Sequence, residues 1–331
     1  MHRVLIIGVG SIGERHLRCF QSTGRADVSL CEPNEALRHR VAEQYKVGHV
    51  FADLDAALSA PHDAAVVCTP APMHVPMATR LANAGLHTLI EKPLSTSVDG
   101  VEALQRIVKE KKLVTAVAYV HRANVALGDM RRAIRGGRFG RPVEVYAVGG
   151  QHFPFYRPAY RDIYYRDRRQ GGGAIQDAMT HILNAVEWFV GPIAKLVVDA
   201  EHKVLDGVEV EDTVHLLARH GGDSNVMASY VLNQHQAPTE NAITVVCEKG
   251  TARIDLVAQR WTSMTQPAGE WRQEFAPAKT PDRDTLFVAQ AHTFLDATEG
   301  KGPVACTLEE GLQTLRVNLA ALRACDQTCW V

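Results

Sequence analysis

Short apolar runs alternate with amphipathic stretches along the first part of the chain. The apolar runs are rich in branched residues and too short for helices. They predict buried strands at 4–7, 28–31, 64–68, 87–90 and 113–118, with a weaker strand near 49–51. Helical patterns separate these strands, from Ser11 and Asp53 onward and at 35–45, 74–84 and 97–111. Alternation of this kind is typical of a parallel, doubly wound sheet.

The pattern changes after about residue 120. Strand-like segments follow one another at 143–148, 194–200, 213–218, 225–232, 242–247 and 253–257, separated by turn residues. Helices are expected at 125–134, 171–190, 284–299 and 308–323. Successive strands joined by turns favour antiparallel pairing, and helices grouped on one face of such a sheet make an α+β domain.

Gly8, Gly10 and Gly13 follow the first predicted strand with the spacing G-x-G-x-x-G. The first glycine permits a tight turn, the second lets the backbone approach a pyrophosphate, and the third lets the next helix pack closely. That helix begins near Ser11, so its free N–H groups face a phosphate. Glu32 ends the second strand, about where the acid that binds the ribose belongs, roughly 20 residues on. The pattern predicts NAD binding, and an ordinary glycine turn is the open alternative.

The predicted fold is therefore α/β, with a Rossmann dinucleotide-binding domain at 1–121 and an α+β domain at 122–331 whose open sheet is mainly antiparallel. Ligands bind doubly wound sheets at the carboxyl ends of the strands. A carboxylate at Glu32 would repel the 2′-phosphate of NADP, so we expect NAD to be preferred. Arg38 and Arg40 lie further along the next helix and are expected to point to solvent.

Composition narrows the classes of partner. The chain has 331 residues, 22% of them charged, with a net charge of −1, so neither nucleic acid nor a membrane surface is an expected partner. Met1 and His2 lead directly into the first strand, so no signal peptide is expected. No apolar run approaches the ~20 residues of a membrane helix, so no membrane span is expected either. The scattered cysteines, without C-x-x-C, favour free thiols in a cytoplasmic protein. Cys325 and Cys329 lack accompanying ligands, so no metal site is expected.

Two stretches carry candidate chemistry. Lys92, in Glu91-Lys92-Pro93 at a strand end, is a cation that can hold an alkoxide or polarise a carbonyl. Asp177 and His181 lie four residues apart on a predicted helix, where a carboxylate beside an imidazole makes a general base. Taken alone, a surface lysine and a surface Asp–His pair remain open alternatives.

Together the motifs resemble the Gfo/Idh/MocA oxidoreductases over nearly the whole length. The motifs are Gly8-x-Gly10-x-x-Gly13-x-x-His16, Thr69-Pro70 with His74, Ala84-Gly85-Leu86-His87 before Glu91-Lys92-Pro93, Gly171 to Asp177 with His181, and Gly191-Pro192. The resemblance implies a nicotinamide-dependent enzyme for a sugar, cyclitol or related polyol, with Lys92, Asp177 and His181 around the reacting carbinol. The residues expected to contact NAD are Gly8, Gly10, Ser11, Ile12, Gly13, Glu32, Thr69, Pro70, His74, Glu91 and Lys92.

The substrate is less well defined. Many members carry an acid at the position of Asn184, and members differ by substrate in the loop at 157–169. The residues expected to contact substrate are Lys92, Arg157, Tyr164, Arg166, Asp177, His181 and Asn184. The loop holds five arginines and several tyrosines, so we hypothesise a substrate with an anionic group, such as a sugar acid or a phosphorylated or nucleotide-linked sugar. Alternatively, the arginines pair with acids of the chain or of a neighbouring subunit, or are solvated.

The expected reaction is hydride transfer between a substrate C–H and the nicotinamide. His181, held by Asp177, takes the hydroxyl proton, and Lys92 stabilises the oxygen. An NAD-dependent glycosidase, a reductase of an imine or bile-pigment-like substrate, and a non-catalytic regulator remain open. The resemblance also implies a homodimer or homotetramer that packs through the outer face of the open sheet, with 225–232 and 242–247 contributing.

Overall fold

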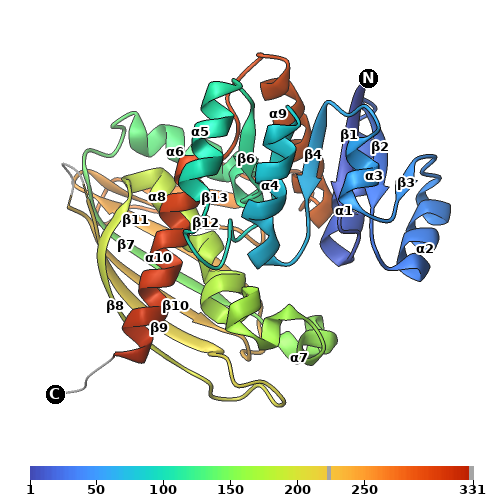
Figure 1. Cartoon of the computed structure of the whole chain (residues 1–331). Coiled ribbons are helices and arrows are strands. Elements are labelled where there is room, and N and C mark those ends of the chain that lie inside the picture. The colour runs from blue at the N-terminus through green and yellow to red at the C-terminus, as the bar shows by residue number, and fades with distance from the viewer. Residues whose placement is uncertain (222–224, 328–331) are drawn as a thin grey trace. The chain divides into compact units, whose positions relative to one another are not determined.

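The computed structural model describes residues 1–221 and 225–327, and the chain forms two compact units (Figure 1). The first unit consists of Met1–Ala123 together with Asp282–Leu312. The second consists of Asn124–Pro281 and the chain from Gln313 onward. The sequence-based division therefore differs from the observed units in one segment, because 282–312 was expected in the second domain.

The described part of the first unit contains a six-stranded parallel sheet in the order β3-β2-β1-β4-β5-β6. Its strands are β1 (His2–Ile7), β2 (Ala26–Cys31), β3 (Val50–Phe51), β4 (Ala64–Val67), β5 (His87–Ile90) and β6 (Thr115–Val117). Its helices include α1 (Ser11–Ser22), α2 (Glu35–Tyr45), α3 (Leu54–Leu58), α4 (His74–Asn83) and α5 (Val101–Glu110), with short 3₁₀ turns η1 (Ala71–Met73) and η2 (Val120–Ala123). The predicted doubly wound sheet is confirmed.

The strand order reverses at β1, which lies between β2 and β4. The carboxyl ends of the strands at such a reversal are the usual ligand site of doubly wound sheets. Backbone bonds extend the pairing to its rim, since Gly8 N–H donates to Cys31 O at 2.9 Å and Cys68 N–H to Ile7 O at 2.8 Å. The glycine turn and the loop after β4 are therefore fixed side by side.

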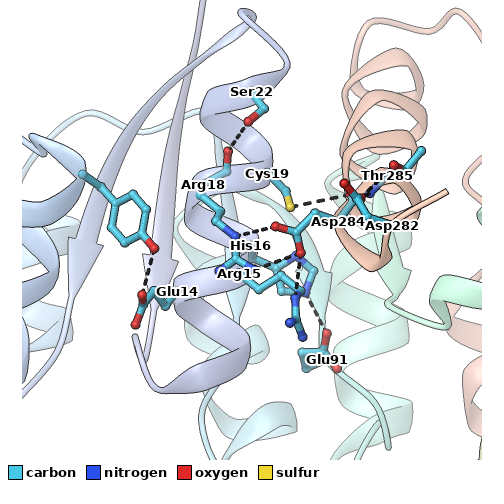
Figure 2. Close-up of polar contacts among 11 residues, drawn as sticks. Glu14, Arg15, His16, Arg18, Cys19, Ser22, Glu91, Asp282, Asp284 and Thr285 are labelled. Atoms are coloured by element: carbon cyan, nitrogen blue, oxygen red, sulfur yellow. Dashed lines mark hydrogen bonds and ion pairs between the residues drawn. The ribbon is translucent and has the colours of Figure 1, made fainter.

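Helix α9 (Arg283–Thr298) belongs to the first unit because it packs on α1. Asp284 accepts hydrogen bonds from Arg15 and Arg18, as Figure 2 shows. Phe287 and Phe294 add edge-on ring contacts to α1 residues. These contacts join residues more than 260 positions apart, so no local pattern could have assigned this helix.

The second unit has an eight-stranded sheet among its described residues, in the order β14-β13-β12-β11-β7-β10-β9-β8. Its strands are β7 (Pro142–Gly150), β8 (Ile193–Glu201), β9 (Thr213–His220), β10 (Met227–Asn233), β11 (Glu240–Cys247), β12 (Gly250–Asp255), β13 (Arg260–Met264) and β14 (Arg272–Phe275). Within the described residues β7 and β10 are parallel, whereas the other neighbouring pairs are antiparallel. The expected open, mainly antiparallel sheet is confirmed, and β13 and β14 are additions to it.

One face of this sheet packs on α6 (Val125–Arg135) and α8 (Thr180–Val190) in a continuous core, joined by residues of α10 (Leu308–Asp326). The opposite face keeps apolar side chains exposed. Tyr146, Val197, Leu217 and Met227 are between 45 and 62% exposed there. The oligomer expected from this face stays a prediction.

The loop before the second glycine cluster is more ordered than the sequence indicates. It contains α7 (Phe153–Tyr156) and the 3₁₀ turns η3 (Pro158–Arg161), η4 (Tyr164–Arg166) and η5 (Arg168–Gln170). A buried apolar cluster under it includes Phe153, Tyr160 and Tyr165. Several of its aromatic residues therefore anchor the loop to its own unit.

No helix in the described ranges is long and apolar enough to cross a membrane. Cys325 lies in the last turns of α10 as a free thiol, and Cys329 lies outside the described residues. The structure therefore leaves the expectation about this cysteine pair as a prediction.

Candidate active site

The glycine turn after β1 has a different steric reason for each glycine. Gly8 has φ +79°, a left-handed conformation that favours glycine. A Cβ on Gly13 would lie 1.8 Å from Gly8 O, so only glycine lets α1 pack this closely. A Cβ on Gly10 would meet no atom of the described chain within 4 Å, so this position faces open space. The turn is thus tight on its inner side and open where a ligand would approach.

The N-terminus of α1 is also open. Gly10 occupies the N-cap position, and no side chain among the described residues caps the helix. Ser11 is exposed and Ile12 half-buried in the first turn. The free N–H groups and the positive end of the helix dipole make this terminus a site for an anion.

Glu32 lies at the end of β2, as the sequence predicts. Its carboxylate is buried and accepts hydrogen bonds from Val9 N–H at 3.1 Å and Asn34 N–H at 2.9 Å. Glu32 therefore helps hold the glycine turn in place. The expectation that Arg38 points to solvent is wrong. Its guanidinium turns back toward the end of β2 and donates to Glu32 O at 2.8 Å.

The loop after β4 lies beside the glycine turn. Thr69 Oγ1 is a buried oxygen without a hydrogen-bond partner among the described residues. His74 is buried, with Nε2 2.7 Å from Thr69 O and Nδ1 2.9 Å from Pro93 O. Burial lowers the pKa of His74, although both carbonyl contacts favour the protonated ring. His74 thus links the loop of Thr69-Pro70 to the loop of Lys92-Pro93.

Glu91 is buried directly after β5. Its Oε1 lies 2.7 Å from His16 Nε2, and its Oε2 accepts a hydrogen bond from Lys92 N–H at 2.9 Å. Burial alone would raise the pKa of Glu91, but the hydrogen bond with His16 and the nearby Lys92 outweigh it and lower the pKa. The contacts of Glu91 are therefore internal, and its contact with NAD stays a prediction.

His121 is a residue that the sequence reasoning missed. It lies in η2 after β6, and its Nδ1 is buried. Burial lowers the pKa of His121 to about 4, with further contributions from the charges of Arg283 and Lys92. A neutral imidazole therefore lies near Lys92. The only sequence signal was a histidine just beyond the last strand of the domain.

In the second unit, Asp177 lies in the π-helical turn Ile175–Met179 that precedes α8. Such turns are frequent at functional sites. Tyr164 OH donates to Asp177 Oδ1 at 2.5 Å, and Arg157 lies 3.9 Å from Oδ2. The Asp177 charge raises the pKa of Arg157. The expected substrate residues Arg157, Tyr164 and Asp177 are thus brought together, and His181 follows half-buried in the first turn of α8.

The arginines of the loop are mostly committed to acids of the chain. The ion pairs are Arg157–Asp177, Arg161–Asp206, Arg168–Glu211 and Arg169–Asp167, at distances between 2.7 and 3.9 Å. Arg166 has no carboxylate partner within the described residues and donates to Arg161 O at 3.4 Å. This arrangement favours the alternative in which most of the arginines stabilise the loop.

Asn184 lies inside the second unit, with 1% of its surface exposed. Its amide donates to Thr314 Oγ1 at 3.0 Å, and Thr314 donates to Glu187 at 2.8 Å. This network joins α8 to α10. The predicted substrate contact of Asn184 stays a prediction, but the structure gives the side chain a packing role and little surface for a ligand.

Glu211 is a second residue that the sequence reasoning missed. Its carboxylate is buried, pairs with Arg168 at 2.7 Å, and accepts a hydrogen bond from Ile175 N–H at 3.1 Å. It therefore fixes the start of the helical segment that carries Asp177. Adjacent acids before a strand, Glu211-Asp212, were the available signal.

The first unit fits a dinucleotide. The features that fit it lie at strand ends next to the strand-order reversal: an uncapped helix start, open space at Gly10, a buried acid at the end of β2, and Thr69 after β4. Two protein-family models match the sequence. The GFO/IDH/MocA oxidoreductase family with an NAD-binding Rossmann fold matches residues 2–119, and the GFO/IDH/MocA C-terminal domain matches residues 128–253. The chain belongs to the Gfo/Idh/MocA family. It is an NAD-dependent oxidoreductase.

Curated relatives in this family match over nearly the full length. The chain is 26% identical to the 1,5-anhydro-D-fructose reductase of Ensifer adhaerens, over 98% of this chain and 96% of the relative. It is 26% identical to the UDP-N-acetylglucosamine 3-dehydrogenase of Acidithiobacillus ferrooxidans, over 97% and 95%. It is also 26% identical to an inositol 2-dehydrogenase of Corynebacterium glutamicum, over 95% and 94%.

Solved structures share the fold of this chain. A levoglucosan dehydrogenase in complex with NADH and levoglucosan superposes with a TM-score of 0.87 at 19% identity, over 100% of this chain and 98% of the other. The WlbA dehydrogenase from Bordetella pertussis, in complex with NADH and UDP-GlcNAcA, gives 0.82 at 24% identity, over 98% and 96%. At these identities the likeness establishes the fold.

Proposed function

We propose that this protein oxidises a CH–OH group of a sugar, sugar acid or cyclitol with NAD, or catalyses the reverse reduction. The observation that carries the proposal is the open glycine turn of the first unit, at the same strand-end edge of the sheet as the loop of Lys92. The family assignment supports the same reaction class, because relatives named for such reactions match over almost the whole chain.

The cofactor residues follow from the chemistry of these strand ends. The first turn of α1, with Gly10, Ser11 and Ile12, would bind the pyrophosphate through backbone N–H groups. Glu32 would accept hydrogen bonds from the adenosine ribose, and Thr69 would offer its hydroxyl. When bound, the nicotinamide supplies the hydride-transfer chemistry.

The remaining roles belong to side chains of the chain. Lys92 stabilises the substrate oxygen as negative charge develops on it. His181 takes the hydroxyl proton in the oxidative direction, and Asp177 orients the imidazole and favours its protonated form. Tyr164 and Arg157 hold the Asp177 carboxylate and would contact the sugar.

The substrate is proposed to be a carbohydrate or cyclitol. Names of the relatives include a neutral anhydrosugar, a nucleotide-linked sugar and inositol, so they leave the charge of the substrate open. The other arginines of the loop have carboxylate partners. If the substrate carries an anionic group, Arg166 is therefore the arginine of the loop that would chiefly bind it. An Arg166→Ala variant with unchanged KM, and a KM that does not respond to salt, would reject an anionic substrate.

We also propose that the protein is a homodimer or homotetramer. The exposed side chains of Tyr146, Val197, Leu217 and Met227 lie on neighbouring strands of the outer sheet face, and an apolar face of this kind is typically covered by a partner. Light scattering at micromolar concentration tests this, and a monomer would contradict it.

A panel of sugars, sugar acids and cyclitols with NAD, followed by NADH absorbance, tests the function. We expect NADH to accumulate with a stable ketone product. An elimination product without net NADH would instead support the glycosidase alternative. Lys92→Ala and His181→Ala should each retain NADH binding and lose about 10²–10⁴-fold in kcat. An unchanged kcat in either variant would remove that residue from the proposed chemistry.

A further inference from the structure

A buried histidine on the cofactor-facing helix contacts the loop that carries Lys92. His16 lies one turn after Gly13 in α1, and its Nε2 is 2.7 Å from Glu91 Oε1 (Figure 2). The two side chains are 1% and 7% exposed. This contact joins α1 to the end of β5, across 75 positions of the sequence.

The chemistry of the two groups fixes which of them donates the hydrogen bond between His16 and Glu91. The carboxylate of Glu91 has a lowered pKa and accepts a proton donor on each oxygen, from His16 on Oε1 and from Lys92 N–H on Oε2. His16 Nδ1 is buried without a hydrogen-bond partner among the described residues. Because a carboxylate oxygen can only accept, Nε2 carries a proton and donates it to Glu91. Glu91 is thus a bridge between a helix side chain and the backbone of Lys92.

Aromatic rings pack against His16. The His16 ring lies 5.2 Å from the Phe287 ring and 6.4 Å from that of Phe20. Asp284 holds α1 from outside through Arg15 and Arg18. An apolar side chain would fill this place without the cost of desolvating a histidine and a carboxylate, so stability gives little reason for the pair.

We propose that His16 is a positioning residue, which holds the backbone of Lys92 through Glu91 in the geometry that the reaction needs. The inference rests on the proposed function, since it assigns Lys92 to the reacting oxygen. Because the same helix offers its N-terminus to the cofactor pyrophosphate, His16 fixes Lys92 relative to the cofactor-binding turn. A displacement of about 1 Å in such a group can cost about 100-fold in rate.

The test compares three substitutions. His16→Leu keeps an apolar side chain of similar size and removes the donor. His16→Gln restores an N–H donor at a similar reach. His2→Leu is the matched control, since His2 makes the same kind of contact with Glu299 at 2.6 Å, at the opposite end of β1.

Hydrogen exchange at the peptide containing Lys92 gives a readout that needs no substrate. We expect exchange of the Lys92 N–H to be roughly tenfold faster in His16→Leu, close to wild type in His16→Gln, and unchanged in His2→Leu. If His16→Leu does not fold, His16→Met carries the same test, because it is also apolar and without a donor but adapts more easily to its surroundings. Unchanged exchange in the folded variant would overturn the proposal.

Kinetics then test the consequence. With a substrate from the panel, His16→Leu should lower kcat by about 10- to 100-fold while the NADH dissociation constant and KM stay near wild type, and His16→Gln should recover most of the rate. In a Lys92→Ala background His16→Leu should add little further loss. Full multiplication of the two losses would show that His16 does not act through Lys92. If Lys92→Ala itself keeps full activity, the role that the proposed function gives to Lys92 fails instead, whatever His16 does.

Discussion

Two glycine-rich turns each precede a helix, one in each unit, and their surroundings differ. The turn at 8–13 leaves its helix start uncapped among the described residues, and a Cβ on Gly10 would meet no described atom within 4 Å. The turn at 171–173 is filled. A Cβ on Gly172 would lie 2.2 Å from Tyr165 O, and one on Gly173 would lie 2.4 Å from Glu211 Oε1.

The helix start after the second turn already has an anion. Glu211 accepts Ala174 N–H with its carbonyl at 2.9 Å and Ile175 N–H with its carboxylate at 3.1 Å. Glycine spacing before a helix therefore does not by itself identify a phosphate site. What distinguishes the first turn is that the chain supplies no group of its own to the helix N-terminus, within the part that the structure describes.

The largest expected effect concerns the tight side of the first turn. Gly13→Ala would place a methyl group 1.8 Å from Gly8 O, a contact that only backbone displacement can relieve. We expect a loss of more than about 4 kcal/mol in the free energy of unfolding, which for many domains abolishes folding. Thermal unfolding of the purified protein measures it, and a transition within a few degrees of wild type would contradict the stated packing.

Next in size is the carboxylate that fills the second turn. Glu211→Ala would leave Ile175 N–H unsatisfied and Arg168 without its buried partner, so we expect a loss of about 2–4 kcal/mol. Glu211→Gln should cost less, because the amide oxygen still accepts from Ile175. Chemical denaturation measures both. Equal stability of wild type and Glu211→Ala would show that the Glu211 carboxylate does not stabilise the helix start after the second glycine turn.

The open side of the first turn predicts the opposite behaviour. Gly10→Ala should fold with near-normal stability, since the methyl group meets no described atom, but it should occupy the space that a pyrophosphate needs. We expect NADH affinity to fall about tenfold or more, measured by fluorescence titration. Gly48→Ala, another position in the first unit where a Cβ meets no described atom, is the control and should bind NADH normally.

A smaller effect is expected at the end of β2, where the ribose would bind. Glu32→Ala removes the carboxylate that would repel a 2′-phosphate, while Arg38 stays beside the end of β2. The preference for NAD over NADP should narrow, as the ratio of kcat/KM values measures. Wild-type protein that uses NADP as well as NAD would contradict the assigned role of Glu32.

The elements that depend mainly on neighbouring residues were predicted correctly from the sequence. The strands of the parallel sheet and the glycine turn follow from apolar runs and motif spacing, and both family and cofactor follow from them. Strands β13 and β14 were missed because they are short and largely polar, as Arg272–Phe275 illustrates. The parallel pairing of β7 and β10 joins segments far apart in sequence, so turn signals could not reveal it.

In the candidate site too, individual residues could be predicted from the sequence, but their distant partners could not. Lys92 and Asp177 were identified from motifs and Tyr164 from the loop before the second glycine cluster, and the structure adds a hydrogen-bond partner for each. Partners such as Glu211 for Arg168 and Thr314 for Asn184 lie 43 and 130 positions away. Such pairings depend on the tertiary fold, which is why the arginine-rich loop suggested an anionic substrate more strongly than the structure does.

The central claim is direct transfer of hydrogen between the substrate carbinol carbon and the nicotinamide. The most direct test uses a substrate from the panel carrying deuterium on that carbon, with NAD and the wild-type protein. We predict NADH labelled at the nicotinamide, in an amount equal to the ketone formed, and a rate lowered by Lys92→Ala. Deuterium released to water, or product formed without labelled NADH, would contradict it.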